Sequence, residues 1–401
     1  MKKRLILDSI FGTGFIFFLI GVVFKFSAFG IFDVLDPIGD ALSDVQITDI
    51  VFSKFRGETK ADENVVLVNI GTLPRAGIAE QIKIISKYNP KVIGLDCFFA
   101  DPKEPYGDSL LIDAISQADN IVLASKLYNC SQEKGECDTL IGSNPMFKNK
   151  ASSLGFANLI SEAADQDQFK SNRSSTPVEK VNGEKHNALA VELVKYHSPD
   201  KVEKLFSRNN PYEVINYRGY GGLGGKFFSL DVIDVFEQNF DPSLIKDKIV
   251  LFGFLGSDFS DKSWEDKYYT PLNEKYAGRT NPDMYGVSIH ANIIAMIINE
   301  DYINEMSASL GIILGIILCF ANVYLFNIIY FKKPLWYDGL TKLIQLAEAI
   351  LLLFLIIQVF HDFSYKLELT LGIVALLLAG DALEVYHGVI KNVYRKIKAK
   401  I

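Results

Sequence analysis

The stretch "VVLVNIGTLPRAGIAEQIKIISKYNPKVIGLDCFFA", residues 65–100, decides the fold class. It opens with an apolar run, continues with Ile78, Ile82 and Ile85 at the spacing of one helix face, and ends in a second apolar run. Short apolar runs joined by a helix are typical of parallel strands, because such strands are covered on both faces. The stretch predicts strands at 65–71 and 91–99 around a helix at 75–89.

The same alternation continues along the middle of the chain. We expect further strands at 121–127, 212–218 and 248–256, and further helices at 109–120, 187–197, 230–236 and 287–299. The last of these helices runs within a few residues of an apolar segment. Together the patterns predict an α/β fold with a mainly parallel sheet, occupying residues 30–305.

The apolar residues gather at the two ends of the chain. Four segments are long and apolar enough to be transmembrane helices, at 5–26, 307–331, 342–360 and 368–390. A cleaved signal peptide is the alternative for the first segment, but Phe26 is bulky where a cleavage site requires a small residue. We therefore expect one membrane helix before the α/β domain and three after it.

Lysine and arginine predict the orientation of these helices. They cluster before the first segment (residues 1–4), between the second and third, and in the basic tail 391–401. The positive-inside rule then places both termini in the cytoplasm and residues 30–305 outside it. The net charge of −7 excludes a general nucleic-acid binder, since such proteins need basic stripes.

Polar residues follow the predicted strands, at the edge where open parallel sheets bind ligands. We interpret them as candidates for binding a small anionic or zwitterionic solute, with helix and turn capping as the alternative for each. The candidates are Asn69, Arg75, Asp96, Asp101, Lys126, Arg218, Ser257 and Asp258.

A glycine-rich segment, "YRGYGGLGG" at residues 217–225, has the G-x-G-x-x-G spacing at Gly219, Gly221 and Gly224. A dinucleotide site requires the last glycine to open a helix, but Ser229, the expected N-cap, lies five residues further on. We interpret the segment as a turn at the rim of the sheet and expect no cofactor.

No pattern in the sequence indicates an enzyme or a metal site. The acidic loop 256–271 contains Asp258, Asp261, Glu265 and Asp266 but lacks the EF-hand spacing. His290 has no nucleophile or metal-ligand motif beside it, which favours helix capping or packing.

Cys130 and Cys137 flank a turn-like hexapeptide, and the sequence leaves open whether they form a disulfide with each other or remain unbridged. In the second apolar segment, Gly311 and Gly315 form a G-x-x-x-G that predicts close helix packing, within the chain or in a dimer. The acids within the later apolar segments are costly in a membrane and often functional. They are Glu348, Asp381 and Glu384.

Several segments resemble the type-two CHASE domain, an extracytoplasmic sensory domain of bacterial signalling proteins. They are "VVLVNIG", "KVIGLDCFFADP", "GDSLLIDAIS", "GFANL", "INYRG", "LIKDKIVLFGFLGSDFSDK" and "YGVSIHANIIAMIIN". The resemblance covers nearly the whole chain and includes the one-plus-three arrangement of membrane helices. It implies a multi-pass protein of the bacterial inner membrane with a large periplasmic domain.

Members of that family commonly carry a cytoplasmic output module after the last membrane helix, whereas this chain ends about ten residues past Ile390. The leading hypothesis is therefore a non-enzymatic sensor of an unknown small molecule that signals to a protein partner in the membrane or periplasm, or as a homo-oligomer. The alternatives are a structural or docking subunit of an envelope complex, and an accessory subunit of a transporter or channel that uses the intramembrane acids.

Overall fold

A computed structural model describes residues 2–27, 46–57, 59–131, 136–159, 171–275 and 280–393. The chain divides into two compact units, one of them continuous and the other formed by two separate segments. One unit is an α/β domain, Phe52–Ile303. The other combines Met1–Val51 with Asn304–Ile401 and consists mainly of apolar helices.

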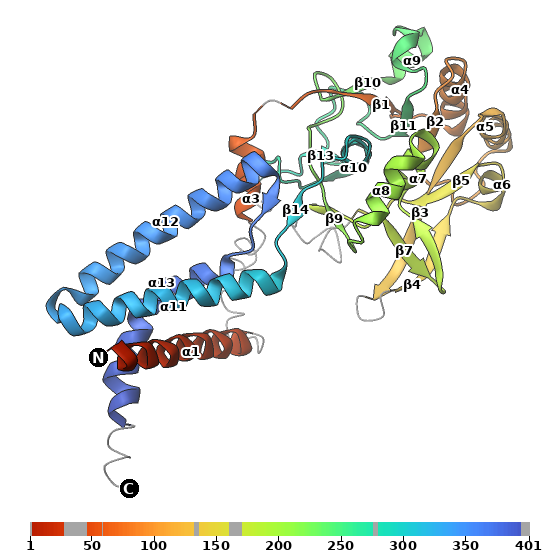
Figure 1. Cartoon of the computed structure of the whole chain (residues 1–401). Helices are drawn as coiled ribbons and strands as arrows, with labels where there is room; N and C mark the ends of the chain where they lie inside the picture. The colour runs from red at the N-terminus through yellow and green to blue at the C-terminus, as the bar shows by residue number, and fades with distance from the viewer. Residues whose placement is uncertain are drawn as a thin grey trace. The chain divides into compact units, whose positions relative to one another are not determined.

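The α/β domain is built on a nine-stranded sheet with the strand order β10-β1-β11-β2-β3-β4-β7-β8, and β5 also pairs with β3 (Figure 1). The strands of this sheet are β1 (Asp62–Asn69), β2 (Val92–Leu95), β3 (Ile121–Ser131), β4 (Glu136–Gly142), β5 (Ser153–Phe156), β7 (Val178–Val181), β8 (Glu184–Asn187), β10 (Phe227–Leu230) and β11 (Ile249–Gly253). The predicted α/β class is correct.

The prediction of a mainly parallel sheet is wrong, because the sheet is mixed. Strands β10, β1, β11, β2 and β3 pair in parallel, whereas β3 with β4 and β7 with β8 pair antiparallel. The antiparallel part comes from polar segments that carry no continuous apolar run, so periodicity did not mark them as strands. Hairpins of this kind tolerate polar residues because one face of an antiparallel ladder can meet water.

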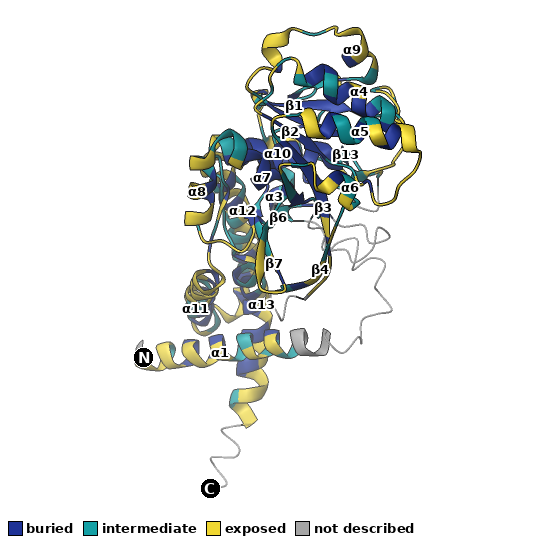
Figure 2. Cartoon of the chain, turned by 90° about the vertical axis from the view of Figure 1, so that its right-hand side faces the viewer, coloured by how far each residue is buried: buried dark blue, intermediate teal, exposed yellow. Residues whose placement is uncertain are grey.

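Helices cover both faces of the sheet. The described helices of the domain are α4 (Arg75–Ser86), α5 (Pro105–Gln117), α6 (Pro145–Lys148), α7 (Leu189–His197), α8 (Pro199–Ser207), α9 (Val232–Glu237) and α10 (Gly286–Asn299), with a 3-10 turn at Pro242–Leu244. Side chains from α4 and α5 share one apolar core with alternate residues of β1, β2 and β11, while α7 and α10 contact the sheet from elsewhere in the domain. In Figure 2 the central strands β1 and β2 are buried, whereas β4 and β7 are largely intermediate or exposed.

Helix α4 illustrates how the sequence forms this core. Ile78, Ile82 and Ile85 are buried against Val66 and Leu95 of the neighbouring strands. Each fully buried isoleucine contributes about 1.5–3 kcal/mol through loss of apolar surface from water. The helix is followed by Asn89 in the left-handed region, at φ 53°, where asparagine is one of the few residues that adopt this conformation readily.

Two predicted elements differ from the structure near the glycine-rich segment. The strand expected at 212–218 is reduced to β9 (Glu213–Val214), which pairs with β6 (Ser174–Ser175) in a separate two-stranded sheet. The edge strand β10 was not predicted. It contains Ser229, so helix α9 is capped instead by Asp231, whose carboxylate accepts a hydrogen bond from Val232 N at 2.9 Å. The expectation that Ser229 begins the helix is therefore corrected.

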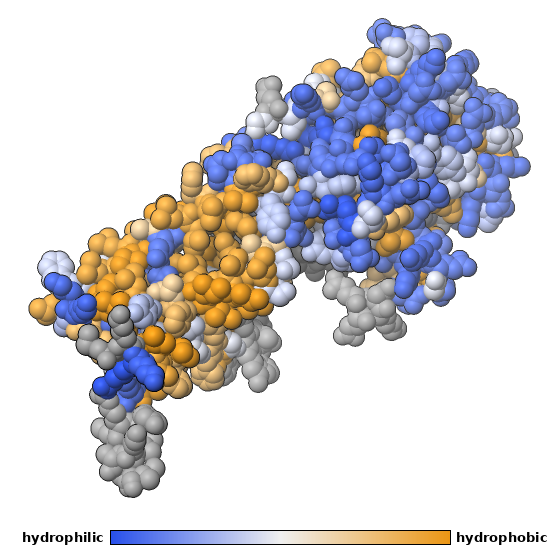
Figure 3. All heavy atoms as spheres, in the orientation of Figure 1, coloured by the Kyte–Doolittle hydropathy of each residue, from blue (hydrophilic) through white to orange (hydrophobic). Residues whose placement is uncertain are grey.

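Four helices of the other unit are long and apolar enough to cross a membrane, judged by length and composition. They comprise Lys3–Val22, Ala308–Lys332, Pro334–Phe363 and Thr370–Val393. The corresponding elements are α1 (Lys2–Ser27), α11 (Ala308–Lys332), α12 (Tyr337–Phe363) and α13 (Thr370–Val385), with short turns α3 (Ile47–Ile50), Pro334–Trp336 and Tyr386–Ile390. Hydrophobic side chains dominate the visible surface of these helices, whereas that of the α/β domain is hydrophilic (Figure 3).

A short parallel pair of strands, β14 (Asn304–Glu305) and β15 (Tyr365–Lys366), joins the start of α11 to the connection between α12 and α13. The predicted domain start at residue 30 and most of the basic tail, from residue 394, lie outside the described residues.

Candidate functional site

The carboxyl ends of the parallel strands place several polar side chains along one edge of the sheet. Strand β1 ends at Asn69, β2 is followed by Asp96, β10 by Asp231, and β11 by the loop that contains Gly256. This edge is where ligands bind in open α/β sheets. The contacts of each side chain show whether it is already bonded within the fold or available to bind a ligand.

The side chain of Asn69 connects several segments at this edge through hydrogen bonds. Its fully buried amide donates to Asp231 Oδ1 at 2.8 Å and to the Gly256 carbonyl at 3.1 Å. Its carbonyl oxygen accepts from the backbone N–H groups of Gly71 and Leu255, at 3.0 and 2.9 Å. The Asn69 side chain thus makes four hydrogen bonds at the ends of β1, β10 and β11.

Arg75 is also committed to the fold. It is buried and paired with Asp108, and it donates to the backbone carbonyl of Asp101 at 2.5 Å. Its guanidinium lies 5.1 Å from the Phe147 ring centroid and 5.6 Å from that of Phe99. The bond from Arg75 keeps the pKa of Asp108 below its usual value. Asp101 contributes its backbone, and its own side chain is exposed.

Ser257 and Asp258 form turns in the acidic loop. Asp258 Oδ1 accepts from Ser260 N at 2.7 Å, and hydrogen bonds from Ser260 lower the pKa of Asp258. Ser257 N donates to Asp261 Oδ2 at 2.7 Å. These bonds are the capping pattern that short acidic side chains make in loops.

One cluster along the edge differs from these structural contacts. Asp96 Oδ2 lies 3.9 Å from Nε2 of His290 on α10, and both side chains are largely buried. Burial raises the pKa of Asp96 to about 7 and lowers the pKa of His290 to about 4. The imidazole is therefore neutral at pH 7 and does not act as an ion-pair partner, and among the described residues Asp96 forms no ion pair with Lys or Arg.

Asp266, from the acidic loop, completes this cluster. Asp266 as a whole is exposed, but desolvation of its carboxyl group, followed by the charges of Asp96 and Glu265, raises its pKa to about 7. Tyr268 donates a hydrogen bond to it, and burial raises the pKa of Tyr268 to about 12. We call Asp96, Asp266, Tyr268 and His290 the edge cluster.

The sequence reasoning named Asp96 but missed the rest of the edge cluster. Asp266 was assigned to a solvated acidic loop, where it is exposed, and His290 to helix packing, which agrees with its burial on α10. Their closeness to Asp96 was not predicted, since 170 and 194 positions separate them from it. The acidic loop 256–271 was the sequence feature that could have indicated these residues. Only the fold, however, brings this loop to the end of β2. Perturbed carboxylates of this kind are concentrated at functional sites, although ion-pair networks also produce them.

The remaining predicted binding residues, Lys126 and Arg218, contact other parts of the domain. Lys126 is exposed, with its ammonium 5.4 Å from the Tyr128 ring centroid on β3. Arg218 donates to Asp301 Oδ2 at 2.5 Å, and its backbone N–H donates to Asn292 Oδ1 at 2.6 Å. Arg218 thus belongs to a second polar network, around the segments where the chain enters and leaves the domain.

A pocket among α7, α8 and α10 has room for about one water molecule. It is lined mainly by apolar side chains, and His290 contributes to its wall. Among the described residues, no group of three or more His, Cys, Asp or Glu side chains is arranged to hold a metal ion.

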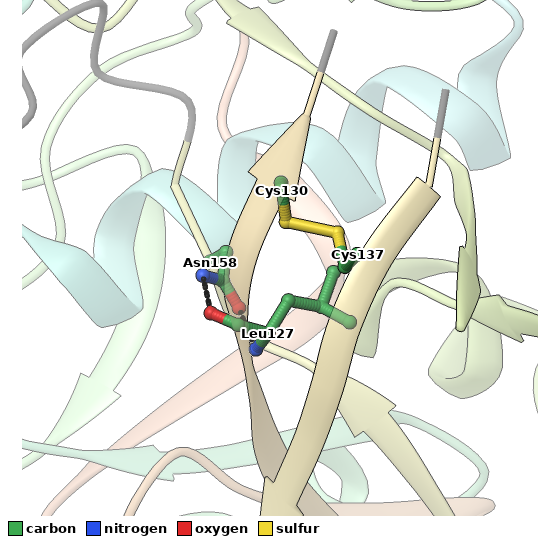
Figure 4. The surroundings of a disulfide bond; sticks show 4 residues. All are labelled: Leu127, Cys130, Cys137 and Asn158. Atoms are coloured by element: carbon green, nitrogen blue, oxygen red, sulfur yellow. Dashed lines mark hydrogen bonds between the residues drawn. A yellow bond between two sulfur atoms is a disulfide. The ribbon is translucent and has the colours of Figure 1, made fainter. Parts of the chain in front are cut away.

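A disulfide joins Cys130 of β3 to Cys137 of β4, which lie directly opposite each other in the antiparallel ladder (Figure 4). Asn158 braces the same strand, since its side chain accepts from Leu127 N at 2.7 Å and donates to the Leu127 carbonyl at 3.0 Å. The disulfide and the amide together stiffen the β3–β4 arm.

In the helical unit, Gly311 and Gly315 face α13. A methyl group on Gly315 would lie 3.2 Å from Gly372 Cα, and one on Gly311 would overlap the Glu368 carbonyl oxygen. The G-x-x-x-G thus allows close approach of two helices within the chain.

The three predicted intramembrane acids have different surroundings. Asp381 is exposed and paired with Lys342 at 2.6 Å, and Glu384 is exposed. Glu348 is half-buried and lies beside Asn322 of α11.

These features define a membrane protein with a folded α/β domain and apolar anchoring helices. The family model of the CHASE2 domain matches residues 43–324. The chain therefore belongs to the CHASE2 family of extracellular sensory domains, which confirms the resemblance seen in the sequence. Comparison with curated proteins found no match, and neither did comparison with solved structures.

Proposed function

We propose that this protein senses a small solute at the edge cluster, in the periplasm, and relays the signal through α11, α12 and α13 to a separate partner protein. Asp96 and Asp266 accept hydrogen bonds when ionised, and each changes charge near neutral pH. The cluster therefore suits a solute that brings a positive charge and hydrogen-bond donors, such as an amine.

The observation that carries this proposal is the placement of two polar residues on α10. His290 lies against Asp96, and Asn292, two residues later, binds the segment around Arg218. The Asn292 amide also donates to the Gly219 carbonyl at 2.9 Å. A shift of α10 at the edge cluster would therefore move the glycine-rich segment directly.

The network around Arg218 extends this route to both ends of the domain. Arg218 is paired with Asp301, two residues before Ile303, where the domain ends. Arg56, near the start of the domain, binds the Tyr217 carbonyl and donates to Asn216 Oδ1 at 2.7 Å. Contacts of this kind form a contiguous path of the type that can couple distant sites.

Hydrogen exchange measured by mass spectrometry on the full chain in detergent tests the sensing role, with the diamine putrescine as the probe. We expect putrescine to slow exchange in peptides covering residues 256–268 and 286–303. The variant Asp96→Asn/Asp266→Asn should abolish both effects. If no small amine changes exchange in either region, an amine is not the ligand class.

The variant Asn292→Ala separates binding from relay. It leaves the edge cluster in place but removes the bonds to Arg218 and Gly219. We expect slowed exchange at 256–268 to remain and the effect beyond residue 299 to disappear. An unchanged effect beyond residue 299 would rule out this route.

A docking subunit of an envelope complex remains the second candidate, because the domain exposes large side chains. Tyr106, Trp264 and Leu223 are 71%, 62% and 89% exposed. Purification in mild detergent followed by mass spectrometry separates the two functions. A stoichiometric assembly without kinase or cyclase components would favour docking over sensing. An ion path through Glu348 and Asp381 is tested by neutralising both acids and measuring function.

A further inference from the structure

Glu348 and Asn322 meet in the middle of two neighbouring apolar helices. Asn322 lies ten residues before the end of α11 at Lys332, and Glu348 lies eleven residues after the start of α12 at Tyr337. Both are therefore roughly 15 Å along their helices from the connecting turn. This depth is about half the thickness of a bilayer core.

The Asn322 amide lies beside the Glu348 carboxyl group, yet both side chains leave acceptors unused. Asn322 is 3% exposed and donates from Nδ2 to the Leu318 carbonyl at 3.2 Å. Glu348 Oε2 and Asn322 Oδ1 are both buried and have no hydrogen-bond partner among the described residues. One turn before Glu348, Gln345 Oε1 is buried and unpartnered as well. At this depth in the helices, the buried side chains have unpartnered hydrogen-bond acceptors and lack donors for them.

An ionised carboxylate cannot relieve this shortage, since it only accepts hydrogen bonds, whereas a protonated one supplies an O–H donor. We propose that Glu348 binds a proton within the helix bundle and that its O–H group donates to Asn322 Oδ1. The proton then satisfies both orphaned oxygens at once and removes the charge from the apolar interior.

The charged groups on the surrounding helices do not offer an alternative. Asp381 of α13 is already paired with Lys342, and Asp8 of α1 is paired with Lys391 at 2.5 Å. Within the described part of the chain, no Lys, Arg or His side chain forms an ion pair with Glu348. Its neighbours on the outer side of α12 are apolar, with Leu351 and Phe354 65% and 63% exposed.

Binding of the proton joins α11 to α12. Loss of the proton replaces this contact with a buried negative charge beside the unpartnered Asn322 Oδ1, which favours separation of the helices or entry of water. The contact between α11 and α12 is thus sensitive to the proton concentration at the site.

Labelling with dicyclohexylcarbodiimide tests the proposal, because this apolar reagent modifies protonated carboxyl groups in apolar surroundings. The unmodified full chain, in lipid nanodiscs, is labelled in buffers from about pH 5 to about pH 10, a range that includes the raised values known for buried glutamates. Peptide mass spectrometry then locates the label. We expect label on Glu348 that falls about tenfold per pH unit above its apparent pKa.

The other acids of the helices are internal controls. Asp381 and Glu384, which are exposed, should remain unlabelled, and Glu348→Gln should lose the label while Glu384→Gln retains it. Absence of label on Glu348 throughout the range would overturn the proposal. Suppression of the label by sodium chloride at constant pH would also overturn it, because the oxygens would then hold a metal cation rather than a proton.

Discussion

At the scale of single residues, the pairing of polar groups separates Asp96 from the residues that build the sheet edge. Asn69 and Arg75 have every strong contact used within the fold. Asp96 is less deeply buried, at 13% side-chain exposure, and within the described residues it forms no ion pair with Lys or Arg, while its neighbour His290 is neutral. A buried carboxylate without such a partner responds to protons and to ligands, because its charged form is poorly stabilised.

The raised pKa of Asp96 gives a pH-dependent stability. The fold prefers the protonated form, so its contribution is complete below the unfolded value of 3.8 and is lost as pH rises through about 7. We expect Asp96→Asn to stabilise the domain, and its advantage to grow between about pH 5 and about pH 8 by on the order of 1–2 kcal/mol. Thermal melting followed by Trp264 fluorescence, in a Trp336→Phe background, measures this.

Asp258→Asn is the matched control for that experiment. Hydrogen bonds from Ser260 lower the pKa of Asp258, so its ionised form stabilises the fold and this contribution is lost as pH falls. The control variant should therefore gain nothing at alkaline pH. A similar alkaline gain for both variants would mean that general charge repulsion, not burial of Asp96, is responsible.

At the scale of elements, the long apolar strands and amphipathic helices were predicted well, and the short polar strands were not. Strands β1, β2, β3 and β11 have continuous apolar runs because both of their faces are covered. Strand β10 has four residues, and β4, β7 and β8 are polar, so their pairing is set by neighbouring strands. Such elements have no periodic signal of their own.

The contact between α11 and α13 depends on Gly315. Even a methyl carbon added to Gly315 would lie 3.2 Å from Gly372 Cα, so a leucine side chain would collide with the backbone of Gly372. We expect Gly315→Leu to destabilise the helical unit by about 1–3 kcal/mol through overpacking. The fraction of protein that stays soluble in detergent after heating measures the loss. Gly339→Leu, which adds a side chain where nothing lies within 4 Å, should behave as the unmodified protein.

The disulfide in the β3–β4 arm predicts a labelling count. The chain has four cysteines, and Cys97 and Cys319 are free. A denatured sample should therefore take up two maleimide groups before reduction and four after it. Four groups without reduction would show that the bond does not form in cells, and Cys130→Ser/Cys137→Ser should give two under both conditions.

At the scale of the whole molecule, the family and the membrane-anchored design follow from the sequence. The CHASE2 match over residues 43–324 and four apolar helices agree with the expected order of segments. The orientation rests on the distribution of lysine and arginine and stays a prediction.

Reporter fusions test that orientation. Green fluorescent protein fused after Ile401 should fluoresce, because the positive-inside rule places that end in the cytoplasm. The same reporter inserted after Phe363, between α12 and α13, should stay dark, since it would be exported unfolded. Fluorescence from the second fusion and none from the first would reverse the predicted topology.

The sequence by itself determined the α/β class, the four apolar helices and the family, because each depends on patterns that are local in the chain or preserved in its order. Only the tertiary structure decided which polar residues lie together. Asp96, Asp266 and His290 come from three separate elements, as do Arg56, Arg218 and Asp301. Their pKa values and contacts depend on burial and on distances that arise only when the strands and α10 pack together, and no local pattern encodes them.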